Sequence, residues 1–404
     1  MKITQYGFLA LLSVVNPPLL AAESTISPGH YLAQVSDCAA CHTASNGAAF
    51  AGGLKIETPL GAIWSTNITP DRQTGIGSYS YEDFARALRE GKGQDGHNLY
   101  PAMPYTDFSK FDDRQLKDLY HYFMQEVPAV HQQNRASDIT WPLNMRWPVS
   151  IWNLMFHHDG PFISDPLKSA EWNRGAWLVQ GPGHCGACHT PRGIAYQEKG
   201  QDQNDPDFLT GGTVDGWHAP SLNGDLRQGL GRWSQQDIVD FLQSGQNGHA
   251  MAFGSMRDVV QQSTQHWTTA DLNAVASYLK SLPVRGSAVT GAAVGGSQAG
   301  TALYQDSCSA CHRRDGKGYS YTIPALAGNP ALLGDDPSSL ISIILYGSQA
   351  PVTRKAVTGP TMPGFGWRLT DEQVAELSNY VRGSWGNQAT LVTAGQVKKL
   401  RKEE

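Results

Sequence analysis

The chain lacks several features that would each point to a different class of protein. It has no spare cysteine, because all six lie in three copies of one short motif, so disulfide bonds are not expected. It has no run of apolar residues long enough to suggest a bundle of membrane helices. It has no excess of basic residues, and its formal net charge of −5 argues against nucleic acid as a partner.

The sequence also lacks the patterns of an organic-substrate active site. Its glycines do not form a phosphate-binding loop after a strand, and its serines do not lie in a nucleophile elbow. The adjacent pair His157 and His158 is a poor metal site, because neighbouring side chains point apart on most backbones. We therefore expect no catalytic residues and no substrate-oxidising site in this chain.

The chemistry is carried by three pentapeptides of the form Cys-x-x-Cys-His. They are Cys38, Cys41 and His42; Cys185, Cys188 and His189; and Cys308, Cys311 and His312. The spacing suits covalent haem attachment, because each thiol adds to one vinyl group and the adjacent histidine ligates the iron. A single copy also occurs as a redox dithiol or half of a zinc site, but three copies that use every cysteine favour haem. The sequence predicts three covalently bound haem c groups.

Methionines are the expected second axial ligands. Met103 lies in Tyr-Pro-Ala-Met-Pro and Met362 in Gly-Pro-Thr-Met-Pro, where the prolines stiffen the loop. The second repeat offers Met251 and Met256 without a flanking proline, and His249 is a third contender. The spacing from the proximal histidine does not choose among them. If both axial positions of each iron are filled, one-electron transfer is the chemistry that remains.

Two prolines stand where a backbone carbonyl can accept the other ring N–H of the proximal histidine. Pro220 follows the second motif and Pro324 the third, although each also fits a simple loop stiffener. The first repeat has residues 65–70, Ser-Thr-Asn-Ile-Thr-Pro, in the corresponding region. We therefore expect the surroundings of its haem to differ from those of the other two.

An internal repeat organises the chain. A glycine-started helical turn precedes each motif, at Gly29, Gly175 and Gly300, and a methionine and a closing amphipathic helix follow it. The closing helices are predicted over 112–126, 269–282 and 370–385, with Asp113, Thr269 and Thr370 or Asp371 as N-terminal caps. This order resembles the small class I cytochrome c. The predicted fold class is all-α, with three tandem cytochrome c-like domains.

The N-terminus reads as a secretory signal. Lys2 supplies the positive charge, residues 6–15 are apolar, and small residues precede Glu23. An uncleaved anchor is the alternative, and both place the protein in the periplasm, at the outer face of the cytoplasmic membrane. The predicted divisions are a signal peptide over 1–22, domains over 23–135, 169–285 and 299–386, an aromatic-rich connector over 136–168, a flexible linker over 286–298, and a polar tail over 387–404.

Nearly all of residues 25–386 resembles one family, the tri-haem cytochrome c subunits of bacterial membrane-bound dehydrogenases. Gluconate 2-dehydrogenase is the best match, with the fructose, sorbitol and quinoprotein alcohol dehydrogenase subunits as relatives. The resemblance is carried by Thr-Pro-Leu-Gly at 58–61, Thr-Asn-Ile-Thr-Pro-Asp at 66–71, Tyr-Pro-Ala-Met-Pro-Tyr at 100–105, Phe-Gly-Ser-Met at 253–256 and Ser-Thr-Gln at 263–265.

The resemblance implies that Met256 is the axial ligand of the second iron. It also implies a flavoprotein or quinoprotein large subunit that oxidises a sugar acid or an alcohol, a small third subunit, and ubiquinone or a terminal oxidase as the electron acceptor. The leading hypothesis is the electron-transfer subunit of a flavin-dependent, gluconate-type dehydrogenase. The alternatives are the same subunit paired with a quinoprotein, and a free periplasmic carrier or a haem enzyme such as a peroxidase.

Membrane attachment is where the chain departs from some relatives. Certain members of the family end in a hydrophobic helix, whereas the tail after Trp385 is polar. The connector instead gathers large apolar residues: Trp141, Trp147, Ile151, Trp152, Leu154, Met155, Phe156 and Phe162. Such a segment either lies at a bilayer interface or covers a seam between domains or a partner subunit. Both readings remain open at this point.

Overall fold

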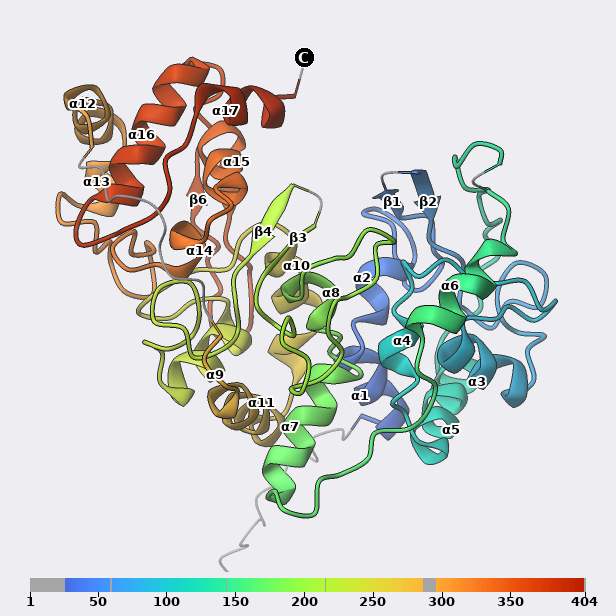
Figure 1. Cartoon of the computed structure of the whole chain (residues 1–404). Helices are drawn as coiled ribbons and strands as arrows, with labels where there is room; N and C mark the ends of the chain where they lie inside the picture. Colours follow the sequence, from blue (N-terminus) through green and yellow to red (C-terminus); the bar gives the residue numbers. More distant parts are fainter. Residues whose placement is uncertain (1–25, 59, 143, 215, 286–295, 403–404) are drawn as a thin grey trace, which may run out of the picture.

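The computed structural model describes residues 26–58, 60–142, 144–214, 216–285 and 296–402. It is rich in helices joined by long loops, and Figure 1 shows them in chain order. The predicted signal peptide over 1–22 and most of the predicted linker over 286–298 lie outside the described residues. None of the described helices has the length and apolar character needed to cross a bilayer.

We name three parts of the chain by their motifs: the first segment (26–135), the second segment (169–285) and the third segment (296–402). The first contains α1 (Pro28–Val35), α2 (Cys38–His42), β1 (Lys55–Thr58), β2 (Gly61–Trp64), α3 (Tyr81–Glu90), α4 (Tyr105–Phe108), α5 (Asp113–His121) and the π-helical turn η1 (Tyr122–Glu126). Helix α6 (Pro148–Phe156) lies in the connector.

The other two segments repeat much of this order. The second contains α7 (Ala170–Gln180), α8 (Gly186–His189), β3 (Gly212–Val214), β4 (Trp217–Ala219), α9 (Gln235–Ser244), α10 (Ser255–Gln262), the 3₁₀ turn η2 (Thr264–His266) and α11 (Thr269–Ser281). The third contains α12 (Gln298–Ser307), α13 (Ser309–His312), α14 (Pro330–Leu333), α15 (Ser338–Tyr346), β5 (Ser348–Gln349), β6 (Thr361–Met362), α16 (Asp371–Gly383) and α17 (Ala394–Leu400).

The same helix crossing occurs in all three segments. The helix before each motif packs against the closing helix, as the pairs α1 and α5, α7 and α11, and α12 and α16. A Cβ atom on Gly29, Gly175 or Gly300 would lie 2.0, 2.0 or 2.5 Å from a carbonyl oxygen of that closing helix. The carbonyls belong to Asp118, Ala274 and Glu376, and a tyrosine Cβ four residues later is a further neighbour in each case. Only glycine therefore allows these helices to approach so closely.

The closing helices begin at capping residues that lie just outside them. Asp112 accepts from the backbone N–H of Gln115, Thr268 from that of Asp271 and Thr370 from that of Gln373. The predictions of Asp113 and Thr269 as caps were wrong by one residue. A capping residue lies just before the first helical residue, where its side chain can accept from the free N–H groups of the first turn. Of the two candidates in the third segment, Thr370 is the cap.

The buried apolar side chains of the described residues form two clusters. One runs from Leu32 to Leu282 and draws on both the first and the second segment. The other runs from Tyr304 to Val397 and belongs to the third segment alone. The predicted polar tail over 387–404 contributes to this second cluster, because Val392 and the α17 residue Val397 are buried in it.

Within the part of the chain that the structure describes, three short antiparallel pairs of strands accompany the helices. They are β1 with β2, β3 with β4, and β5 with β6. The helix-rich part of the predicted fold class is thus confirmed, and the structure adds strands that an all-α description leaves out. The division into three tandem domains stays a prediction.

Candidate haem sites

Each motif places its cysteines and its histidine on one turn of helix. Residues 38–42 form α2, whereas Cys185 and Cys308 stand directly before α8 and α13. The two thiols of a motif and the histidine after them therefore lie together on one short helical turn. This is the arrangement that attachment of one haem through two thioether bonds requires.

The three motif histidines share one contact. Nδ1 of His42 lies 2.7 Å from the carbonyl oxygen of Thr66, Nδ1 of His189 lies 2.7 Å from that of Pro220, and Nδ1 of His312 lies 3.1 Å from that of Pro324. A carbonyl only accepts, so Nδ1 carries the proton and Nε2 keeps its lone pair. That lone pair is the one an iron needs, so these residues fit an iron-bound haem.

The first segment makes this contact without a proline. Pro220 and Pro324 occupy the positions expected of them, and Thr66 supplies the same carbonyl to His42. Every residue has a main-chain carbonyl, so the sequence could not predict that Thr66 is the residue whose carbonyl contacts His42. The histidine contact of the first site is thus of the same kind as in the other two.

Burial sets the protonation of these groups. It lowers the pKa of His42 and His312, and it lowers that of His189 to about 4, which keeps the imidazoles neutral. It also raises the pKa of Cys38 and Cys185 to about 12. A redox dithiol needs an accessible thiolate, so these surroundings are unfavourable to that alternative.

The candidate methionines lie in different local structures. Met103 follows the turn at Tyr100 and packs against the first apolar cluster. Met362 is part of β6 and pairs with Ser348. Met256 lies in the first turn of α10, and Met251 forms an isolated bridge with Gln246. Their roles as iron ligands stay predictions.

The loops of the first two segments can be matched through their bridges. Lys92 pairs with Asn98 five residues before Met103, and Gln246 pairs with Met251 five residues before Met256. Met256 therefore corresponds to Met103, and Met251 corresponds to Asn98. His249 stacks on Trp233, and its Nε2 lies 3.5 Å from Asp237 Oδ2.

The first and second motifs are neighbours in space. Helix α10 packs against α2, and the charge of Cys188 helps to raise the pKa of Cys41 to about 11, after the larger effects of burial and Asp37. The residue before each of these motifs has a left-handed backbone, with φ 53° at Asp37, which is buried, and φ 34° at His184, which is half-buried. The first and second motifs therefore lie side by side.

Two buried carboxylates near the second motif were not expected from the sequence. Burial raises the pKa of Asp107 and of Glu198, and both raise the pKa of Cys185. Arg192 lies 3.6 Å from Glu198 and partly offsets the burial. Asp107 and Glu198 are far apart in the sequence, so no local motif predicts that they lie near the same cysteine.

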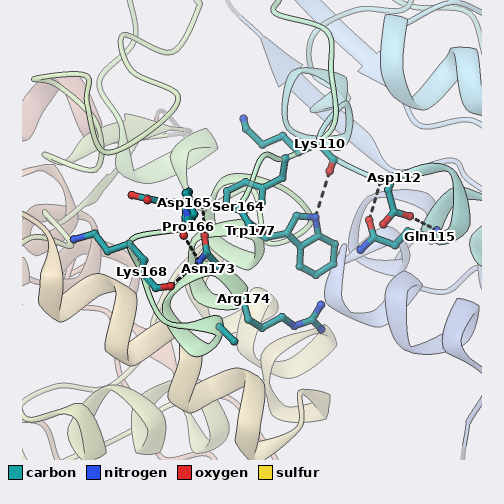
Figure 2. A pocket seen from close by; sticks show the side chains of 12 residues that line it. Lys110, Asp112, Gln115, Ser164, Asp165, Pro166, Lys168, Asn173, Arg174 and Trp177 are labelled. Atoms are coloured by element: carbon teal, nitrogen blue, oxygen red, sulfur yellow. Dashed lines mark hydrogen bonds between the residues drawn. The ribbon is translucent and has the colours of Figure 1, made fainter.

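A cavity of about 530 Å³ opens along the seam of the first and second segments. Figure 2 shows the Trp177 ring within it, with Nε1 donating to the carbonyl of Lys110 at 3.3 Å. The Arg174 guanidinium lies over that ring at 4.5 Å and also binds Asp271 through two hydrogen bonds. None of the predicted haem residues lines this cavity.

Comparison with known proteins identifies the family. The cytochrome c family model matches residues 173–283 and 297–385, which include the second and third motifs. The gluconate 2-dehydrogenase cytochrome c subunit of Pantoea cypripedii is 48% identical over 95% of this chain and 91% of its own length.

Two further relatives have other dehydrogenase names. The cytochrome c subunit of the quinone alcohol dehydrogenase of Gluconobacter oxydans (strain 621H) is 45% identical over 94% of this chain and 83% of its own. The fructose dehydrogenase cytochrome subunit of Gluconobacter japonicus is 36% identical over 95% and 84%. The predicted resemblance is confirmed, and the chain belongs to the family of cytochrome c subunits of dehydrogenases.

Proposed function

We propose that this chain is the electron-transfer subunit of a dehydrogenase complex and carries three covalent c-type haems. It takes electrons from a flavin-dependent large subunit of the gluconate type and passes them to ubiquinone or a terminal oxidase. The observation that supports this best is the recurrence of one contact, Nδ1–H to a backbone carbonyl, at all three motif histidines.

In this proposal each motif holds one haem through its two cysteines. The histidines His42, His189 and His312 and the methionines Met103, Met256 and Met362 would hold the iron atoms. The haem, when bound, supplies one-electron transfer. The carbonyls of Thr66, Pro220 and Pro324 hold the histidine rings in one tautomer and one orientation.

Met256 is preferred to Met251 because it matches Met103 in the bridge register described above. Met256→Ala should abolish the second haem's share of the thioether-to-iron absorption band and lower its reduction potential. Met251→Ala is the matched control and should leave both nearly unchanged. The reverse pattern would assign the iron to Met251.

The proposed location is the periplasm, at the outer face of the cytoplasmic membrane. It rests on the secretory signal expected from residues 1–22 and on the ubiquinone acceptor expected for the complex. A quinoprotein alcohol dehydrogenase is the second candidate partner, favoured by the 45% identity to such a subunit.

The proposal is tested by isolating the native complex and identifying the cofactor of its large subunit. We expect flavin there, about three covalent haems by mass in this chain, and the loss of one when Cys185 and Cys188 are replaced by alanine. Pyrroloquinoline quinone in the large subunit would select the second candidate, and two haems in the unmodified chain would remove one motif.

A second experiment asks whether this chain needs its partner. The purified cytochrome is mixed with gluconate, fructose, sorbitol or ethanol while its haem absorption bands are followed. We expect no reduction until the large subunit is added, because a two-electron oxidation needs a cofactor that accepts a hydride or its equivalent. Reduction without a second protein would reveal a catalytic site in this chain.

A further inference from the structure

Helix α6 has two apolar faces, and the residues that the structure describes cover only one of them. On the covered face, the indole Nε1 of Trp152 donates to the carbonyl of Ala195 at 2.8 Å. The carbonyl of Phe156 accepts from the Gln201 side chain at 3.0 Å. Figure 1 shows α6 beside α4, away from the third segment. The helix is thus held against the first segment and against a loop of the second.

The same face fixes the loop that carries Met103. Asn98, five residues before this methionine, donates from its amide to Ser150 Oγ at 2.8 Å. Tyr105, two residues after it, donates from its hydroxyl to Asn153 Oδ1 at 2.7 Å. Contacts on both sides of the methionine hold α6 in one place, so its outer face is a rigid surface.

The outer face is an apolar stripe with helical spacing. Trp147, Ile151, Leu154 and Met155 recur at intervals of three or four residues and are between 50% and 87% exposed. Trp141, just ahead of the helix, is 77% exposed. Large apolar side chains gathered in this way mark an interaction surface more often than isolated exposed residues do.

Charge decides between a bilayer and a protein as the occupant. Residues 147–167 contain no lysine or arginine, and they include Asp159 and Asp165. Arg146 and Lys168 flank this range, and both are engaged elsewhere. The Arg146 guanidinium stacks on Tyr100 at 3.5 Å and donates to the carbonyl of Asn98, and Lys168 Nζ lies over the Trp172 ring at 5.3 Å. Helices that lie on anionic membranes carry basic residues on their polar side, and this segment carries acidic ones.

We propose that the outer face of α6, with Trp141, is the docking surface for the dehydrogenase large subunit, and that it fits an apolar groove on that subunit. This inference rests on the proposed function. The centres of protein interfaces are rich in tryptophan and methionine and poor in charge, as this stripe is. Helices that bind in grooves present anchors at this spacing. A subunit seated here would lie one helix width from the Met103 loop.

The test compares two variants of the full-length haem-loaded cytochrome. Ile151→Asp combined with Leu154→Asp places two charges in the middle of the stripe. Val357→Asp, at a residue of the third segment that is 74% exposed, is the matched control. Binding is measured by calorimetry against the large subunit separated from the native complex. We expect at least about 30-fold weaker binding for the double variant and less than about twofold for the control.

Folding is checked by the haem absorption spectrum and far-ultraviolet circular dichroism, which the outward-facing changes should leave unaltered. Should the double variant fail to fold, Trp147→Ser makes a milder change on the same stripe, with about tenfold weaker binding expected. Full affinity of either folded variant for the large subunit would overturn the assignment.

A membrane occupant is tested in parallel with vesicles of phosphatidylglycerol and phosphatidylethanolamine. We expect the same small sedimentation with vesicles for the unmodified protein, the double variant and the control. Loss of vesicle binding in the double variant, with binding to the large subunit retained, would make the bilayer the occupant and overturn the proposal. Failure of the proposed function looks different, because then the unmodified cytochrome itself neither binds the large subunit nor is reduced by it.

Discussion

The second segment meets its two neighbours through seams of different character. Toward the first segment the seam contains hydrogen bonds and also a shared apolar core: Trp177 packs edge-on against Phe111, with ring centres 5.8 Å apart, and both belong to one buried cluster. Toward the third segment it is joined by hydrogen bonds, such as those between the backbone of His218 and the hydroxyl of Ser339.

This difference predicts which segments unfold together and which unfold separately. Segments that share a core lose it together, whereas segments joined by hydrogen bonds keep their own cores when they part. We infer that residues 26–285 unfold as one unit and residues 296–402 as another. The number of motifs alone would have suggested three units that unfold independently.

Cutting the chain is the most severe test of this comparison. A fragment of residues 26–285 should fold and retain both of its motifs' haems, because its apolar cluster is complete. A fragment of residues 26–168 should fail to fold, because it leaves Phe108 and Phe111 without their partners His184 and Trp177. Circular dichroism and calorimetry of both fragments provide the measurement. A stable shorter fragment would show that the shared cluster is dispensable.

Trp177→Ala should destabilise the apolar seam by about 4 kcal/mol, the usual cost of removing a buried tryptophan side chain. The loss should lower the unfolding transition of the first two segments and leave that of the third unchanged. Calorimetry of the whole protein measures both transitions. Trp367→Ala, at an exposed tryptophan of the third segment, serves as the control. Equal shifts of the two transitions would contradict the separation.

Arg382→Met tests whether a loss of stability inside the third segment stays confined to that segment. The buried guanidinium donates to the carbonyls of Leu332, Gly334 and Thr390, and the substitution leaves those acceptors without a donor. We expect a loss of about 3 kcal/mol, confined to the transition of the third segment. Arg368→Met, at an arginine whose side chain is 41% exposed, should cost little. A shift in the first transition as well would mean that the polar seam transmits stability.

Tyr31→Phe should give the smallest effect, about 1.5 kcal/mol at neutral pH, because the hydroxyl donates to Asp271 across the apolar seam at 2.6 Å. Burial, and then Asp271, raise the pKa of Tyr31 from 10.0 to about 12. The folded pKa is the higher one, so this contribution is complete below pH 10 and is lost as the pH rises toward 12.

The measurement is denaturant unfolding of the wild type and of Tyr31→Phe between pH 7 and pH 12. The difference in the free energy of unfolding should narrow above pH 10. Tyr196→Phe, at an exposed tyrosine, is the control and should follow the wild type throughout. A difference that stays constant to pH 12 would show that Tyr31 does not ionise in the way described.

The features predicted from the sequence are those that depend on residues close together in the chain. The motifs, the closing helices and the carbonyls of Pro220 and Pro324 were predicted, and the structure has those helices and contacts. Contacts between distant residues gave no such signal. The bonds of Ser339 to His218 join residues 121 positions apart, and Thr66 acts through its backbone, which its side chain does not reveal.

The connector shows a second limit. Its apolar residues were visible in the sequence, but a helix that is apolar on both sides does not reveal which side faces outward. The polar contacts of Ser150 and Asn153 settle the inner face, and they depend on Asn98 and Tyr105 some 50 positions earlier.

The helix crossings at Gly29, Gly175 and Gly300 also offer a way to recognise decayed copies of this repeat in other genes. A repeat can lose its cysteines by substitution and still keep two packed helices. It can equally keep its cysteines and acquire a side chain at the crossing, where a Cβ would meet a carbonyl oxygen at 2.0 to 2.5 Å. The first kind of copy can no longer attach its cofactor covalently, and the second can no longer pack its closing helix against the helix before the motif. Comparing the glycine position with the cysteine positions distinguishes these two kinds of copy.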